Sequence, residues 1–174
     1  MSQAGTEKFS KNRNPHQLRN SCTVTQSQEA IWTINGLIET LKDGEKGFQE
    51  ASEAVSDPHL KSLFEQYSQQ RHRFAHELQA QGQSLGELKP KKWIRAAGAM
   101  HRAWINLKST VTSGDDKAIL TECERGEDSA MCGFEEALHD RLTSQVREIV
   151  SRQFTEITSA HDRVKQLRDV KRKM

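Results

Sequence analysis

Apolar side chains recur at steps of three and four residues along most of this chain, with polar side chains between them. This period places the apolar residues on one face of a helix. The first such stripe covers residues 29–55, and we expect it to end at Asp57-Pro58, because the residue before a proline is disfavoured in helical geometry. A second stripe covers residues 60–85 and leads into a loop over residues 82–92, where glycine and proline interrupt the pattern.

Two further stripes follow, and the first of them is interrupted. Apolar residues keep the helical period over residues 93–111 and again over residues 119–138. Between these parts, the segment Ser113–Asp116 combines a helix-ending glycine with an acidic helix start. The last stripe covers residues 146–167. We therefore predict four long amphipathic helices, of which the third is interrupted near Ser113–Asp116.

Four such helices predict an all-α fold, an antiparallel four-helix bundle. The chain has only 3 Pro and 10 Gly among 174 residues, which argues against an all-β fold with its frequent turns. Three segments follow from the pattern. We expect a polar, disordered tail over residues 1–26, the bundle over residues 27–170 and a basic C-terminal end over residues 171–174.

A short internal sequence repeat indicates how the helices pair. Gly-Phe-Gln-Glu-Ala at residues 47–51 reappears as Gly-Phe-Glu-Glu-Ala at residues 133–137. The apolar positions that follow each copy agree as well. This predicts two helical hairpins related by an approximate twofold symmetry.

Ionisable side chains fall inside the apolar stripe of each predicted helix. They are Glu45, Arg71, Glu127 and His161, and the helical period turns each of them toward the middle of the bundle. A buried charge must be paired or bound to a metal. We expect a buried polar network in which Glu45 pairs with Arg71 and Glu127 bonds to His161. Such a layer would fix the register of the helices.

The alternative for the same layer is a metal site. Di-metal bundles use a Glu from each of two helices and a Glu-x-x-His pair from each of the others. Glu45 and Glu127 supply the lone carboxylates, but neither His161 nor any histidine of the second helix has a Glu three positions before it. The reduced ligand set would be Glu45, Glu127 and His161 with Glu156 nearby, holding iron or another divalent metal.

A basic segment offers a different chemistry. Residues 89–108 carry six Lys or Arg and no acid, with two tryptophans among them. Basic residues with aromatics can bind nucleic acid or anionic surfaces. The tryptophans also fit the apolar stripe, which leaves an ordinary basic helix face as the other interpretation. The candidate anion-binding residues are Lys89, Lys91, Lys92, Arg95, Arg102 and Lys108.

Composition excludes several of the remaining classes of function. The 26 basic and 24 acidic residues nearly cancel, so net charge indicates no partner. No apolar run reaches the length of a membrane span, and the first residues contain no secretory signal. Cys22, Cys123 and Cys132 form no disulfide or Cys-x-x-Cys pattern, so we expect free thiols in a cytoplasmic protein. No phosphate-binding loop or nucleophile motif occurs.

Five strings of residues together resemble a known family. They cover residues 42–51, 104–108, 115–120, 123–128 and 161–169, in the same order and spacing. The chain resembles the bacterial ferritin-like four-helix-bundle family that is catalogued as a domain of unknown function. The resemblance implies a ferritin-like bundle in a bacterial cytoplasm, among stress-associated proteins. The wider superfamily implies iron or peroxide chemistry, and only Glu45 and Glu127 match its ligands.

The sequence therefore leads to three hypotheses of function. The first is a non-catalytic, stress-associated bundle without a cofactor, which acts through a protein partner or through self-association. The second is a metal-binding oxidoreductase or storage protein with the reduced ligand set. The third is a weak binder of nucleic acid or anionic surfaces through Lys89–Lys108.

Overall fold

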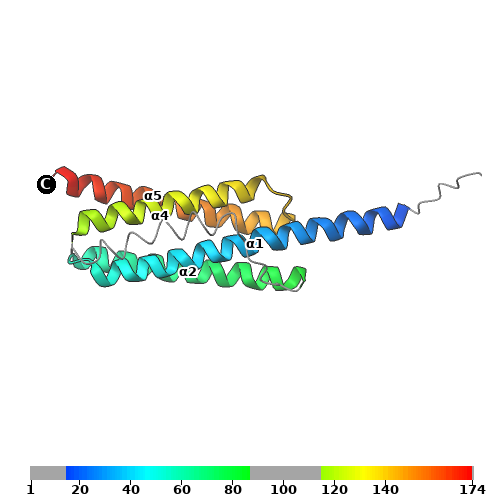
Figure 1. Ribbon diagram of the computed structural model, residues 1–174, viewed down its shortest axis with the longest axis horizontal. Coiled ribbons are helices and arrows are strands. Elements are labelled where there is room, and N and C mark those ends of the chain that lie inside the picture. The colour runs from blue at the N-terminus through cyan, green and yellow to red at the C-terminus, as the bar shows by residue number, and fades with distance from the viewer. Residues whose placement is uncertain (1–14, 87–114, 174) are drawn as a thin grey trace, which may run out of the picture.

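The computed structural model describes residues 15–86 and 115–173, with side chains from Gln28 to Gly86 and from Asp115 to Lys171. Its helices are α1 (Pro15–Ala54), α2 (Pro58–Leu85), α4 (Asp116–His139) and α5 (Ser144–Lys173). They lie side by side along one long axis (Figure 1). This confirms the predicted all-α four-helix bundle. The part of the predicted third helix that precedes Ser113 lies outside the described residues.

Local capping sets two of the helix starts. Asp57 precedes α2 in extended geometry, and its carboxylate accepts a hydrogen bond of 2.9 Å from the backbone N–H of His59, while Pro58 takes the first helical position. Asp115 caps α4 in the same way, accepting from the N–H of Lys117 at 3.0 Å. The predicted break at Asp57-Pro58 and the predicted acidic restart after Gly114 are confirmed.

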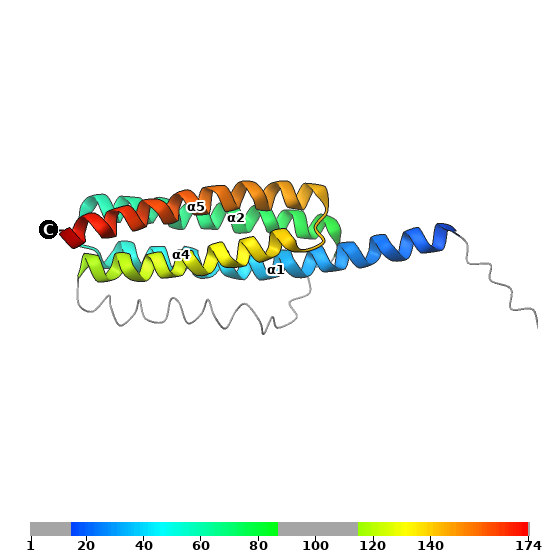
Figure 2. The ribbon, with the colours of Figure 1, turned by 90° about the horizontal axis from the view of Figure 1, so that it is seen from above.

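The first helix begins earlier than the apolar stripe indicates. The boundary predicted between a tail over residues 1–26 and the bundle does not interrupt α1, which begins at Pro15 and extends past the end of the other helices (Figures 1 and 2). Extending an existing helix needs no new nucleus, so polar residues can continue it without an apolar face. The apolar stripe therefore marks only part of α1, and residues 1–14 lie outside the described part.

Two contacts, one just after the end of α1 and one in its middle part, show the direction of α4 relative to α1. The backbone N–H of Ser56 donates to Asp116 Oδ1 at 2.8 Å, and Thr33 Oγ1 donates to Asp140 Oδ2 at 2.7 Å. The end of α1 therefore lies beside the start of α4, and the start of its buried part lies beside the end of α4. The two helices are antiparallel, as are the helices of each hairpin, α1 with α2 and α4 with α5.

The two hairpins are joined across the length of the bundle. Gly86, at the end of α2, lies beside Ile31 of α1, and α4 begins at the other end of the bundle, beside Ser56. The end of α2 and the start of α4 therefore lie at opposite ends of the bundle, and α2 and α4 run parallel to each other (Figure 2). The bundle consists of two antiparallel hairpins with one long crossover, which agrees with the predicted pairing.

The core is divided by a polar layer. One apolar cluster lies toward the α4–α5 connection and the other toward the α1–α2 connection. Arg71 of α2 lies between them, with its guanidinium carbon 6.0 Å from the centroid of the Phe74 ring in the first cluster and 5.7 Å from that of Phe48 in the second. The predicted polar layer therefore has a charged side chain at its centre.

Two glycines allow a test of the helix boundaries with the same substitution. A Cβ at Gly36, in the interior of α1, would have nothing within 4 Å, and we expect Gly36→Ala to raise the free energy of unfolding by about 0.5–1 kcal/mol. Gly86 has a φ of 145°, which an L side chain adopts only under strain, and we expect Gly86→Ala to lower that free energy by about 1–3 kcal/mol. Urea unfolding measures the free energy of unfolding of both variants. Changes of the same sign and size in the two variants would contradict the placement of the α2 terminus.

Candidate functional site

The site is built around one buried ion pair. Arg71 of α2 and Glu127 of α4 both have side chains that are 1% exposed, and Arg71 Nη2 lies 2.5 Å from Glu127 Oε2. Both residues fall on the apolar stripes of their helices, which is why the fold turns them inward. Charge-assisted hydrogen bonds of this kind are the strong ones, since the surrounding protein excludes water.

Space for the Arg71 side chain comes from a glycine on the neighbouring helix. A Cβ at Gly44 of α1 would lie 3.5 Å from Arg71 Cγ and 3.6 Å from Cδ. The aliphatic part of the arginine therefore packs directly on the backbone side of α1. A side chain larger than alanine at this position would occupy the volume that the arginine fills.

A chain of hydrogen bonds links the ion pair to the surface. Arg71 Nη1 donates to Gln70 Oε1 at 2.6 Å, and Gln70 Nε2 donates to Glu156 Oε2 of α5 at 3.1 Å. Arg152 then contacts Glu156 at 3.4 Å and also pairs with Glu77 of α2. Gln70 and Glu156 are 86 positions apart, the offset of the internal sequence repeat, so their contact agrees with an approximate twofold relation between α2 and α5.

Burial controls the titration of the groups near the pair. Desolvation raises the pKa of Glu127 above its ordinary value, and the positive charge of Arg71 opposes that rise. Burial also raises the pKa of the Cys123 thiol well above its usual range, with the negative charge of Glu127 adding to the effect. A raised pKa lowers the fraction of thiolate, which is the nucleophilic form of cysteine.

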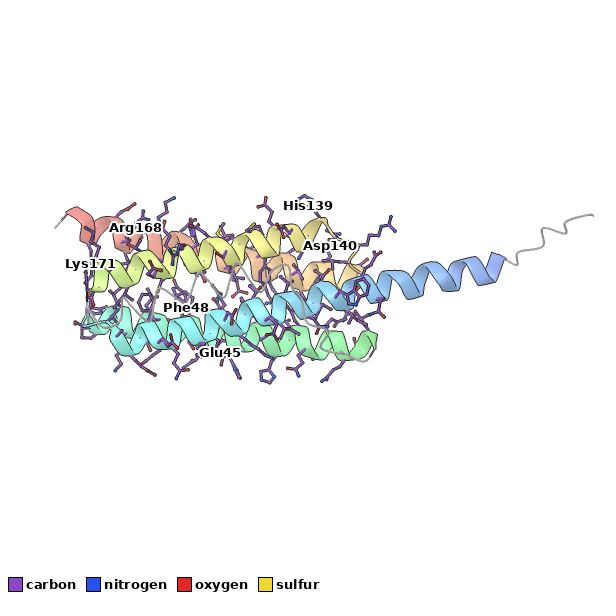
Figure 3. All side chains as sticks on the ribbon, viewed as in Figure 1. Glu45, Phe48, His139, Asp140, Arg168 and Lys171 are labelled. Carbon is purple, nitrogen blue, oxygen red and sulfur yellow. The ribbon has the colours of Figure 1, made fainter. Side chains whose placement is uncertain are left out.

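The predicted partner of Arg71 was wrong. Glu45 has a side chain that is 32% exposed, and its Oε1 lies 2.9 Å from Nδ1 of His72, so it is paired on the surface (Figure 3). The helical period placed Glu45 near the edge of the buried face of α1 but did not determine its depth. Arg71 reaches across the bundle to α4 because Glu127 is buried at the same level.

His161 also has a partner other than the predicted one. The histidine is 8% exposed, with Nε2 at 3.0 Å from Asp128 Oδ1 of α4 and Nδ1 at 3.1 Å from Asp162 Oδ1 of its own helix. The predicted bond to Glu127 is not formed, because Glu127 points to Arg71. The contact with Asp128 nevertheless ties α4 to α5 next to the ion pair.

The four residues of the predicted metal set do not converge. Glu127 is paired with Arg71, Glu156 with Gln70 and Arg152, and the remaining two with the partners given above. Among the residues that the structure describes, no group of three or more His, Cys, Asp or Glu side chains could hold a metal ion. The arginine takes the central position that a cation would need.

The predicted anion-binding surface lies outside the described residues. All six of its basic residues fall in the segment 87–114: Lys89, Lys91, Lys92, Arg95, Arg102 and Lys108. Of the described helices, none is long and apolar enough to cross a membrane.

Two glutamines of the network, Gln70 and Gln153, are not among the site residues that the sequence predicts. Gln153 is completely buried on α5, and its Nε2 donates to the Phe74 carbonyl at 3.3 Å and to Glu77 Oε2 at 2.8 Å. Gln153 falls between Val150 and Ile157 on the apolar stripe, and an uncharged polar residue at such a position is the sequence signal for it. The signal for Gln70 is its position next to Arg71.

These features define the class of protein as a two-hairpin helical bundle whose central layer holds an ion pair. The family model described as Domain of unknown function (DUF2383) matches residues 29–140, which include α2, α4 and the buried part of α1. The chain therefore belongs to the DUF2383 family. No curated protein matches the chain.

A double-mutant cycle tests the ion pair. Arg71→Met leaves a buried carboxylate without its cation, and Glu127→Leu leaves a buried guanidinium, so each should lower the free energy of unfolding by about 3–5 kcal/mol. The double variant removes both charges and should recover most of that loss, because apolar side chains of similar volume fill the layer. Urea unfolding measures all four proteins. Additive losses in the double variant would contradict the pairing.

The free energy of unfolding of Arg71→Met should depend on pH more strongly than that of the unaltered protein. The pKa of Glu127 is raised on folding, so the folded chain binds a proton at Glu127 at a higher pH than the unfolded chain does. The free energy of unfolding that this protonation contributes is therefore lost as the pH rises through the raised pKa. Arg71→Met removes the opposing charge and raises this pKa further. We expect the variant to lose more stability between about pH 5 and about pH 8 than the unaltered protein does. A pH-independent loss would mean that Glu127 is not the group left uncompensated.

Proposed function

We propose that this chain is a non-catalytic ferritin-like bundle protein of the bacterial cytoplasm, stress-associated, that acts through protein–protein contacts. The topology supports the ferritin-like part of the proposal. Two antiparallel hairpins joined by one long crossover are the arrangement of ferritin-like bundles, whereas simple up-and-down bundles have short connections throughout.

The observation that carries the non-catalytic part is the arginine in the central layer. Ferritin-like bundles with a di-metal centre place carboxylates and histidines from four helices around the metals. Here the corresponding layer contains a guanidinium within 2.5 Å of Glu127, which is the only fully buried carboxylate in the part of the chain that the structure describes. A divalent cation would meet the positive charge of Arg71 and would have to displace it from Glu127. The residues present do not fit a di-metal centre.

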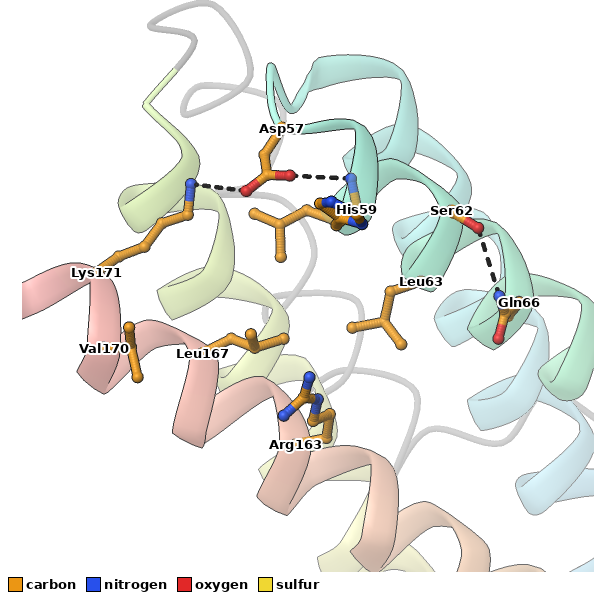
Figure 4. Close-up of a pocket in the computed structure, with 10 residues that line it drawn as sticks. Asp57, His59, Ser62, Leu63, Gln66, Arg163, Leu167, Val170 and Lys171 are labelled. Atoms are coloured by element: carbon orange, nitrogen blue, oxygen red, sulfur yellow. Dashed lines mark hydrogen bonds and ion pairs between the residues drawn. The ribbon is translucent and has the colours of Figure 1, made fainter.

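A groove between α2 and α5 offers a surface for a partner. The helices are tied at the level of Gln70 and Glu156, and again at the bundle end, where Lys171 lies 3.3 Å from Asp57. A groove of about 520 Å³ lies toward that end (Figure 4). Its apolar lining is Leu60, Leu63, Leu167 and Val170, the last of which is 52% exposed.

The charge around this groove favours an acidic partner. Arg163 lines the groove, and its Nη1 donates a hydrogen bond of 2.8 Å to the amide oxygen Oε1 of Gln166. Within the described residues, the Arg163 guanidinium has no carboxylate partner. Residues 162–173 of α5 carry six basic and two acidic residues, and of the basic ones Arg168 and Lys171 are already paired with carboxylates. We propose that the occupant is an amphipathic helix of a partner protein, with apolar residues one turn apart and carboxylates beside them.

Metal titration tests the non-catalytic part. We expect anaerobic Fe²⁺ addition to the full-length protein to show no tight site that depends on Glu127. The comparison is between the unaltered protein, Glu127→Gln and the control Glu124→Gln, which removes a carboxylate from the same helix that pairs with Arg168 instead. Stoichiometric Fe²⁺ binding that is lost in Glu127→Gln and kept in Glu124→Gln would overturn the proposal and favour the metal-binding alternative.

A pair of synthetic peptides tests the groove. Both form an amphipathic helix with leucines one turn apart, and one carries glutamates where the other carries lysines. We expect the acidic peptide to bind the full chain with an affinity that falls with salt, and Arg163→Glu or Val170→Asp to weaken it by about tenfold. Fluorescence anisotropy measures the binding, and Arg141→Glu, outside the groove, is the control.

Two results would contradict this surface. Equal affinity for both peptides would show that the basic rim does not select the partner. A homodimer that dissociates in Val170→Asp, seen by sedimentation, would show that a second copy of the chain fills the groove instead.

A further inference from the structure

A pair of histidines lies on the exposed side of α2, away from the buried ion pair. His72 and His76 are one helical turn apart, and their ring centroids are separated by 4.6 Å. Both residues are exposed, and the His72 side chain is 54% exposed. Residues at this spacing are neighbours on a helix surface, so both rings can approach one ligand.

A carboxylate from the neighbouring helix orients one of these rings. Glu45 Oε1 of α1 lies 2.9 Å from Nδ1 of His72. A carboxylate accepts a hydrogen bond at this distance, which favours the tautomer of the neutral ring that has its hydrogen on Nδ1 and its lone pair on Nε2. Histidines that ligate metals usually have this arrangement, because a carboxylate on the second nitrogen fixes the ring and makes the first nitrogen more basic.

We propose that His72 and His76 form a surface binding site for a transition-metal ion such as Zn²⁺, with Glu45 as the residue that positions His72. Two imidazoles at i and i+4 of a helix are a known way to hold zinc on one helix face. Imidazole nitrogen suits Zn²⁺, Ni²⁺ and Cu²⁺, whereas Mg²⁺ and Ca²⁺ prefer oxygen ligands. Water completes the coordination, since the described residues bring no third ligand close enough.

This site is independent of the proposed non-catalytic role. It lies on the α1–α2 surface rather than in the central layer, and its ligands are not those of the di-metal pattern. Glu45 was predicted as a direct metal ligand inside the bundle. In the structure it lies at the surface, where it contacts His72. The exposed position means that the variants below leave the core packing intact.

The test is Zn²⁺ titration of the full-length protein by calorimetry, together with the histidine side-chain signals in NMR spectra. Before metal is added, His72 should show the tautomer with the proton on Nδ1. Zn²⁺ should then bind at one saturable site and shift the Nε2 signal of His72 and the signals of His76. We expect His72→Asn and His76→Asn each to weaken binding by about tenfold or more.

Matched controls separate the roles of the three residues. His139→Asn removes an exposed histidine on another helix and should leave the affinity unchanged. Glu45→Ala should weaken binding by about tenfold, whereas Glu50→Ala, which removes a carboxylate from the same helix, should not. Far-ultraviolet circular dichroism checks that each variant is folded.

Two outcomes would overturn the proposal. Zn²⁺ affinity that survives the loss of either His72 or His76 would show that the pair is not the site. Affinity that falls with both histidines but is equal in Glu45→Ala and Glu50→Ala would refute the positioning role of Glu45. Both outcomes are distinct from Fe²⁺ binding that depends on Glu127, which tests the central layer.

Discussion

The structure depends on the burial of one arginine in the centre of a helical bundle. A guanidinium there must find a counter-charge, hydrogen-bond acceptors and room for its long side chain. Glu127 of α4 supplies the charge, Gln70 supplies an acceptor, and Gly44 of α1 supplies the room. The aromatic rings on both sides add favourable contacts with the cation. Since these groups come from three helices, the arginine fixes how those helices are placed along one another.

The polar layer also explains why the contacts between α2 and α5 change along the length of the bundle. From Arg71 the hydrogen bonds run outward through Gln70 and Glu156, and these contacts hold α2 and α5 together in that part of the bundle. Toward the C-terminal end of α5, the polar contact between the same two helices among the described residues is the ion pair of Lys171 and Asp57. The groove opens between the two levels. The network therefore positions the surface that we propose for a partner.

The sequence predicts most of the fold and less of the site. Apolar stripes locate buried helix faces, and Asp57-Pro58 marks a helix end, because both are local effects. The start of α1 at Pro15 is not predictable from a stripe, since the sequence carries no sustained apolar period before residue 29. For the site, the helical period identifies Arg71 and Glu127 as inward-facing. It does not predict which inward-facing residues meet, because that depends on the arrangement of four helices, and so Glu45 was paired with the wrong partner.

The central claim is that Arg71 neutralises Glu127 and holds the position that a metal would take. Paramagnetic relaxation by Mn²⁺ tests it directly, since this ion broadens the NMR signals of carboxylates to which it binds. With Mn²⁺ equimolar to the protein, the account predicts that the side-chain carboxyl signal of Glu127 and the Nε signal of Arg71 stay sharp. Selective broadening of the Glu127 carboxyl, with release of Arg71 from its contact, would contradict the account.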